Sequence, residues 1–287
     1  MRESVIAAAV FLVAVFQGAT ASAGAALSSG CAPAVLAIDG NQIWARTSGS
    51  GSPTVVFEAG FGNDSTAWSP ITKRLQAARV RMFVYDRAGM GKSTINAATP
   101  YSLQNDVQIL RTALDDCHVT GPVVFVGHSY GGAIGLVAAG QDARIQGLVL
   151  IEAVVPGVWT QDEVDRNLKS MRPQYEEIRA QAPALALVAI PWAEAMPQSA
   201  QLLNTLPVSE SLPILDIEAD HGQSDPASEQ IWTQAHKAFV SGHVNRSRVV
   251  AAGSSHKVMA DRPDLVVAAI RKMIRRVRVA SVSTQRR

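Results

Sequence analysis

The residue of this sequence best placed to do chemistry is Ser129, in the run Gly127-His128-Ser129-Tyr130-Gly131-Gly132. Residues 123–126 before it are apolar and mostly β-branched, which is typical of a strand buried on both faces of a parallel sheet. The apolar residues after it are typical of a helix. Glycines on both sides allow this strand and helix to approach closely around a serine in a strained backbone conformation. The pattern predicts that Ser129 is a nucleophile.

A serine hydroxyl attacks a substrate only if a base removes its proton. The chain has six histidines, and we predict that His256 is the base. It lies in a Gly-Ser-Ser-His loop after the last predicted strand, and such loops gather at the carboxyl edge of a parallel sheet, where Ser129 also lies. His128 is expected to be structural. The other histidines are expected to be solvated: His118, His221, His236 and His243.

A carboxylate is needed to orient the imidazole and to stabilise its positive charge. We predict that this acid is Glu152, because a charged residue there ends an otherwise apolar strand. Asp225 and Asp220 follow the next predicted strand and are the alternatives, with Asp225 favoured over Asp220. For each of the three, an ordinary surface or turn carboxylate is the competing interpretation.

Two backbone amides are predicted to form an oxyanion hole, which stabilises the negative oxygen of a tetrahedral intermediate. One is the amide of Tyr130, the residue after the nucleophile. The other is the amide of Phe61, which follows Gly60 at the end of the predicted strand 54–58.

The elements that must position these residues alternate along the chain. An antiparallel hairpin is expected over 35–47, with its turn at Asp39-Gly40. Buried strands are then predicted at 54–58, 81–85, 123–126, 146–151, 213–217 and 247–251, with helices at 68–78, 102–118, 227–240 and 261–278. Such alternation indicates an α/β protein in which helices cover both faces of a parallel sheet.

The alternation of predicted strands and helices is interrupted between residues 153 and 212. This segment has long helical patterns and no convincing strand, and it contains Trp159 and Trp192. We expect it to be a helical cap inserted into a core made of residues 24–152 and 213–287. The cap is predicted to line an apolar substrate pocket.

Composition limits the other functions. The chain has 287 residues with a net charge of +2, an ordinary globular composition that needs neither a metal nor disulfides to build a core. No Cys and His cluster has zinc-site spacing. Gly91-Lys92-Ser93 is not a phosphate-binding loop, because Asp86 stands where that motif requires glycine; Asp86 is expected to hold turn amides instead. We expect no metal and no nucleic-acid partner.

The first residues resemble a targeting segment. Residues 5–16 are apolar but too short to span a bilayer, which takes about 20 residues. The cleavage pattern Ala21-Ser22-Ala23 follows, so we predict a signal peptide over 1–23, a mature chain that is secreted or periplasmic, and no membrane span after cleavage. A retained anchor is the alternative. Cys31 and Cys117 could form one disulfide, although Cys117 could also be a small buried apolar residue.

Taken together, four stretches resemble the serine-dependent α/β-hydrolases, of the esterase and lipase type with a cap. They are Val55–Gly62, Tyr85–Ser93, Gly127–Gly132 and Gly253–His256. The resemblance covers nearly the whole chain after residue 23. It implies an eight-stranded, mostly parallel sheet, no cofactor, and the chain order nucleophile, acid, histidine.

Two departures from this family pattern matter. The usual histidine before the oxyanion glycine is Ala59, and the usual Gly-x-x-Asp after the seventh strand reads Ala219-Asp220-His221-Gly222. The missing aspartate is a second reason to place the acid at Glu152. Haloalkane dehalogenases also place an acid at this earlier strand end, but their nucleophile is an aspartate, so Ser129 argues against dehalogenation.

The sequence therefore predicts an exported hydrolase that cleaves a small or medium apolar carboxylic ester through an acyl-enzyme on Ser129. Its partner would be a small-molecule ester. The same triad acting on an amide, a lactone or a carbon–carbon bond is the alternative. A binding protein without catalysis on the same scaffold is less favoured, because Ser129 and His256 are both present.

Overall fold

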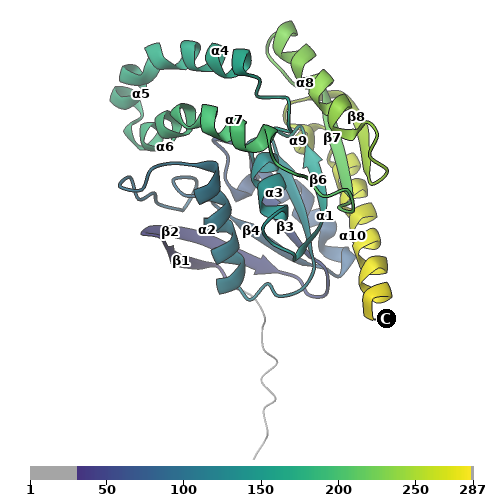
Figure 1. The fold of residues 1–287 in the computed structure, drawn as a ribbon. Coiled ribbons are helices and arrows are strands. Elements are labelled where there is room, and N and C mark those ends of the chain that lie inside the picture. The colour runs from purple at the N-terminus through teal and green to yellow at the C-terminus, as the bar shows by residue number, and fades with distance from the viewer. Residues whose placement is uncertain (1–30, 286–287) are drawn as a thin grey trace, which may run out of the picture.

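The computed structural model describes residues 31–285, so the predicted signal peptide over 1–23 lies outside the described residues. Eight strands form one sheet in the order β1-β2-β4-β3-β5-β6-β7-β8 (Figure 1). The antiparallel hairpin and the parallel strands of the sequence prediction are both present. The strands are β1 Ala34–Ile38, β2 Asn41–Ser48, β3 Thr54–Glu58, β4 Arg81–Tyr85, β5 Val123–His128, β6 Ile145–Ile151, β7 Ile214–His221 and β8 Arg246–Ser255.

Two apolar cores, one on each face, hold the sheet between helices. One core packs α2 Leu103–Asp116, α3 Tyr130–Ala139 and α8 Pro226–Val240 against the sheet. The other packs α1 Ser69–Leu75, α9 Val258–Asp261 and α10 Pro263–Gln285. All residues of β3 and β5 are buried, which explains why both strands read as continuous apolar runs in the sequence.

The cap segment of the sequence prediction forms helices in the structure. Between β6 and β7 the chain makes α4 Gln161–Met171, α5 Tyr175–Gln181, α6 Pro183–Glu194 and α7 Met196–Asn204. In Figure 1 these helices lie together above α2 and α3. None of the helices between residues 31 and 285 is both long and apolar enough to cross a bilayer.

The structure differs from the predicted elements mainly near the carboxyl terminus. β7 continues past Ile217 to His221, because Glu218 inside it pairs with Arg248 of the neighbouring strand β8. The helix predicted over 261–278 is α10, and a short helix that was not predicted, α9, precedes it and is separated from it at Arg262. Pro263 explains the break, since the residue before a proline is disfavoured in helical conformation. Asp86 accepts hydrogen bonds from the amides of Ser65 and Lys92, at 2.8 and 2.9 Å, as predicted.

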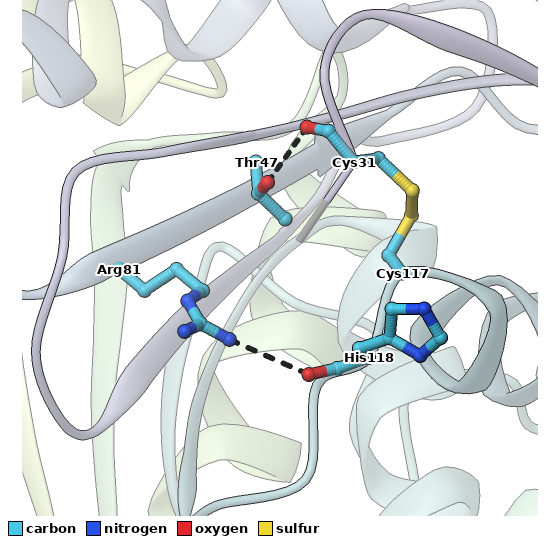
Figure 2. The surroundings of a disulfide bond; sticks show 5 residues. All are labelled: Cys31, Thr47, Arg81, Cys117 and His118. Carbon is cyan, nitrogen blue, oxygen red and sulfur yellow. Dashed lines mark hydrogen bonds between the residues drawn. A yellow bond between two sulfur atoms is a disulfide. The ribbon is translucent and has the colours of Figure 1, made fainter. Parts of the chain in front are cut away.

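A disulfide joins Cys31, just before β1, to Cys117 at the end of α2. Figure 2 shows it beside Thr47, whose Oγ1 donates a hydrogen bond of 2.7 Å to the Cys31 carbonyl oxygen. Of the two sequence interpretations of Cys117, the structure has the disulfide, and its sulfur is fully buried. The disulfide ties the start of the hairpin to a helix that packs on one face of the sheet.

Replacing both cysteines by alanine is expected to lower the free energy of unfolding by about 4.5 kcal/mol, because the disulfide closes a loop of 86 residues and so restricts the unfolded chain. Denaturant unfolding with and without a reducing agent measures this difference. The double variant should not respond to the reducing agent, whereas the wild type should. Equal unfolding midpoints for the oxidised wild type and the double variant would contradict the prediction.

Candidate active site

Ser129 lies on the turn between β5 and α3, with φ 52° and ψ −124°, a conformation that residues other than glycine rarely adopt. Two hydrogen bonds hold the turn: the Ser129 amide donates to the Ile151 carbonyl oxygen at 3.1 Å, and the Val154 amide donates to the Ser129 carbonyl oxygen at 3.0 Å. A Cβ atom on Gly127 would lie 2.6 Å from the carbonyl oxygen of Gly131. The glycines therefore permit the close approach of strand and helix that the sequence predicts.

The strand register brings three predicted site regions to one edge of the sheet. Glu58 at the end of β3 pairs with Gly127 of β5, and His128 pairs with Ile151 of β6. Ser129 follows the end of β5 and Glu152 follows the end of the adjacent strand β6. The loop with Phe61 follows β3, which is the neighbour of β5 on its other side. This edge is the carboxyl edge, where the sequence predicts the site.

His256 and Glu152 lie side by side, with 3.6 Å between His256 Nδ1 and Glu152 Oε1. The Glu152 side chain is 1% exposed and that of His256 is 36% exposed. Burial raises the pKa of Glu152, but the neighbouring His256, a hydrogen bond from the Ala219 amide and the charge of His236 together outweigh it, so the pKa lies below its usual value. Glu152 is therefore a carboxylate at neutral pH.

Two further contacts fix the Glu152 carboxylate. Ala219 donates its amide to Oε2 at 2.6 Å, and Gln223 Nε2 donates to Oε1 at 2.8 Å. Both donors come from the end of β7 and the loop after it. The sequence analysis did not identify Gln223, which carries no pattern that would mark it.

Gly222 explains why there is room for Glu152. A Cβ atom on Gly222 would lie 1.9 Å from Glu152 Oε1, so the carboxylate occupies the space that a side chain at position 222 would need. Position 222 is where the family pattern quoted above has its aspartate. The glycine at position 222 thus leaves open the space that the carboxylate of Glu152 fills.

The two alternative acids lie elsewhere. Asp220 Oδ2 accepts a hydrogen bond of 3.1 Å from the Gly253 amide and lies 3.8 Å from His221 Nε2. Asp225 is the N-cap of α8, where its Oδ1 accepts from the first amides of the helix. Neither carboxylate pairs with His256, whereas Glu152 does.

Of the histidines predicted to be solvated, His118 and His221 are exposed. The prediction is wrong for His236, which is fully buried with its Nδ1 2.7 Å from Oδ2 of the equally buried Asp216. Burial lowers the pKa of His236, but the charge of Asp216 outweighs it and the pKa lies above its usual value. The pairing joins α8 to β7, so the residues around His236 in the sequence do not reveal it.

His128 is 3% exposed and supports the His256 loop, in keeping with its predicted structural role. Its Nε2 lies 2.8 Å from the carbonyl oxygen of His256, so the neutral ring donates a hydrogen bond to that oxygen. The other ring nitrogen, Nδ1, faces Gly60 closely: a Cβ atom there would be 2.7 Å away. Burial, reinforced by the nearby His256, lowers the pKa of His128 to about 4.

The depressed pKa of His128 predicts acid sensitivity. The unfolded chain, with an ordinary histidine pKa of 6.5, binds this proton more tightly than the folded chain. The free energy of unfolding should therefore fall as pH drops from about 6.5 to about 4, by a total of about 3 kcal/mol from this residue. Urea unfolding across this pH range measures the slope. His128→Gln should remove that contribution and His221→Gln, at an exposed position, should keep it; equal slopes in all three proteins would contradict the prediction.

The two predicted oxyanion residues are anchored differently. The ring of Phe61 stacks on Trp192 of α6, with 4.1 Å between ring centroids. Tyr130 begins α3, so its amide has no acceptor within the helix. Its hydroxyl donates to Asp106 Oδ2 and accepts from Tyr101, both at 2.9 Å.

A cavity of about 440 Å³ contains Ser129 and His256 in its wall, together with Phe61 and Tyr130. Tryptophans and methionines of the segment between β6 and β7 also line it: Trp159, Met171, Trp192 and Met196. The predicted apolar pocket is only part of this wall, because polar side chains line it too: Glu163, Arg166, Asn167 and Gln223. Within residues 31–285 no group of three His, Cys, Asp or Glu side chains could hold a metal ion.

Comparison with known proteins places the chain in a family. The sequence model of the alpha/beta hydrolase family matches residues 55–269. The chain belongs to this family. The hydrolase is 29% identical over 223 residues to the uncharacterized protein YqjL of Bacillus subtilis (strain 168), a match that covers 77% of the hydrolase and 83% of YqjL. It is 33% identical over 108 residues to "Putative carbamate hydrolase RutD" of Stutzerimonas stutzeri (strain A1501), covering 36% of the hydrolase and 38% of that relative.

Solved structures share the fold of the hydrolase. An esterase from Exiguobacterium antarcticum superposes with a TM-score of 0.61 at 19% identity, covering 84% of the hydrolase and 98% of the esterase. The haloalkane dehalogenase DatA from Agrobacterium tumefaciens C58 has a TM-score of 0.60 at 21% identity, with 85% and 95% covered. The predicted α/β-hydrolase fold is confirmed.

Proposed function

We propose that the protein is a carboxylic-ester hydrolase that forms an acyl-enzyme on Ser129. The observation that carries this proposal is the shared cavity wall of Ser129 and His256, with the buried carboxylate of Glu152 3.6 Å from the imidazole. A serine, a base and a carboxylate in contact with that base are the groups that acyl transfer requires. Esterases among the structural neighbours are consistent with this class.

In the proposed mechanism, His256 takes the proton of Ser129 as the hydroxyl attacks the ester carbonyl carbon. Glu152 orients the imidazole through Nδ1 and stabilises its positive charge. The amides of Phe61 and Tyr130 bind the oxyanion of the tetrahedral intermediate. The imidazolium then protonates the leaving alcohol, and a water molecule that His256 deprotonates releases the acid from Ser129.

The cavity supports a small or medium substrate. Its volume of about 440 Å³ lies within the usual range for small-molecule sites. We assign residues 153–212 as a cap over the site, because α4, α6 and the loop before them contribute Trp159, Met171 and Trp192 to the wall. The apolar side of the wall would take the acyl chain.

Export is part of the proposal. Its support is the cleavage pattern Ala21-Ser22-Ala23 and the disulfide between Cys31 and Cys117, since disulfides persist in oxidising compartments such as the periplasm. The intact mass of the mature protein tests it. A chain that begins at Gly24 supports export, and a chain that retains residues 1–23 contradicts it.

Purified mature protein should hydrolyse p-nitrophenyl acetate and butyrate and should be labelled by a fluorophosphonate probe at Ser129. Peptide mapping by mass spectrometry identifies the labelled serine. Labelling at Ser170, which also lines the cavity, would contradict the assignment of the nucleophile. Labelling at Ser129 without ester hydrolysis would contradict the ester substrate class alone.

A second candidate keeps the triad and changes the bond to an amide, a lactone or a carbon–carbon bond. The relative named as a carbamate hydrolase makes carbamates and amides the first members of this panel. Comparing kcat/KM across p-nitrophenyl esters, anilides, carbamates and lactones separates these classes. A binding protein without catalysis would neither turn over any of them nor take up the probe.

A further inference from the structure

A buried ion pair lies directly behind the predicted oxyanion loop. Glu58 ends β3, and Arg87 follows β4 by two residues. Arg87 Nη1 is 2.5 Å from Glu58 Oε1, and the two side chains are only 4% and 1% exposed. A charged pair this deeply buried needs hydrogen bonds for its remaining donors and acceptors.

Arg87 finds those acceptors in the oxyanion loop itself. Nη1 also donates to the carbonyl oxygen of Ala59, and Nη2 donates to that of Gly60 at 2.8 Å. The planar guanidinium thus bridges two successive carbonyl groups and the carboxylate of Glu58. A lysine at this position could not match this fork.

The bond to Gly60 orients the amide of Phe61. The Gly60 carbonyl and the Phe61 N–H belong to one planar trans peptide group, in which the C=O and N–H bonds point in opposite directions. When Arg87 binds the oxygen, the N–H points away from Arg87. Ser129 is close by, since a Cβ atom on Gly60 would lie 3.1 Å from Ser129 Cβ.

The second oxyanion residue contacts the same arginine. The guanidinium carbon of Arg87 lies 5.5 Å from the ring centroid of Tyr130. The Tyr130 hydroxyl is bound to Asp106, whose negative charge also favours the cation of Arg87. One buried cation is therefore adjacent to both residues whose amides are assigned to the oxyanion hole.

We propose that Arg87, held by Glu58, is the positioning residue that aims the Phe61 amide at the oxyanion formed on Ser129. This inference rests on the proposed function, because it needs an acyl or phosphonyl transfer that develops negative charge on an oxygen. It assigns to the Glu58–Arg87 pair a role in the transition state rather than in substrate binding.

The test compares Arg87→Lys with the wild type at about pH 8, where Glu58 is ionised although burial raises its pKa to about 7 against the opposing charge of Arg87. Loss of one aligned oxyanion donor should lower kcat for p-nitrophenyl butyrate by about 10²-fold and leave KM within about threefold. Phosphonylation of Ser129 by a fluorophosphonate should slow to a similar degree, because it also develops an oxyanion.

Arg144→Lys is the matched control. Arg144 likewise binds a carbonyl oxygen, that of Val119, and a carboxylate, that of Asp142, but these acceptors lie before β5 and β6, at the strand ends opposite Ser129. This variant should keep kcat even if its melting temperature falls. Equal losses of kcat in the two variants, or an Arg87→Lys variant with kcat within about threefold of the wild type, would overturn the inference.

A second variant and the wild-type activity keep the test of Arg87 decisive. If Arg87→Lys does not fold, Glu58→Gln replaces it: the amide oxygen still accepts from Arg87 but holds it less firmly, so kcat should fall about tenfold at unchanged KM. The melting temperature should fall as well, because the buried Arg87 cation loses its charged partner. An unchanged kcat in Glu58→Gln overturns the inference. Failure of the proposed function shows in the wild type instead, which would then neither hydrolyse esters nor react with the probe, and the inference would fall with it.

Discussion

Ser129→Ala is expected to lower kcat for p-nitrophenyl butyrate by about 10⁵-fold or more, with little change in KM. The reason is that alanine removes the only atom of this side chain that can bond to the acyl carbon, while the cavity wall stays in place. Fluorophosphonate labelling should be lost with activity. The strained backbone at φ 52° should tolerate alanine about as well as serine, so the melting temperature should change little.

Ser170→Ala is the matched control for this prediction. Ser170 lines the same cavity but lies on α4, away from the turn after β5. Its substitution should leave kcat within about threefold of the wild type, since it removes no group that the acyl transfer requires. Full activity in Ser129→Ala would refute the assignment of the nucleophile, and a large loss in Ser170→Ala alone would move it there.

Glu152→Gln is expected to lower kcat by about 10⁴-fold while the protein stays folded. Glutamine has the shape of glutamate, but it lacks the negative charge that stabilises the protonated His256, and it can turn an amide N–H toward Nδ1 and so favour the wrong tautomer. The same measurement on Asp225→Asn should give nearly wild-type turnover, because Asp225 caps α8 and does not pair with His256. The assignment fails if the two results are reversed.

Gly222 offers a stricter version of this test. The carboxylate of Glu152 fills the space next to Gly222, and Gly222 is not among the glycines with positive φ, so an aspartate fits its backbone. Glu152→Gly removes the acid, and glycine suits the φ of +41° at that position. Adding Gly222→Asp to Glu152→Gly should then recover part of the lost kcat. No recovery with a folded double variant would mean that the position of the carboxylate, and not its presence alone, limits turnover.

Much of this fold could be predicted from sequence because its signals are local. The largely apolar runs that form β3, β4 and β5 are central, buried strands, and such strands need no partner residue to be recognised. The turn at Ser129 was equally visible, since its glycines, strand and helix are consecutive in the chain. β7 and β8 were predicted too short. The residues past Ile217 and Ala251 are mostly polar or small, and only the pairing of the two backbones extends the strands through them, so that three residues of the predicted Gly-Ser-Ser-His loop belong to β8.

Pairs between distant residues were beyond the reach of sequence patterns. His236 was expected in solvent and instead lies buried against Asp216, 20 residues earlier in the chain. Glu58 and Arg87 were not singled out, although Glu58 carries the same signal that identified Glu152: a charged residue that ends an apolar strand. In both cases the charge is tolerated because a partner from another element neutralises it in the core.

The sequence by itself determined that this chain is an alpha/beta hydrolase with Ser129 on the turn after β5 and His256 after β8, because residue type and spacing specify both. Which carboxylate lies beside His256 was decided only by the tertiary structure. An acid after β6 and an acid after β7 both lie between Ser129 and His256 in the chain, so chain order does not choose between them. The ends of β6 and β7 are also neighbours in the sheet. Only the packed structure shows that the carboxylate of Glu152 occupies the space that the missing side chain of Gly222 leaves open.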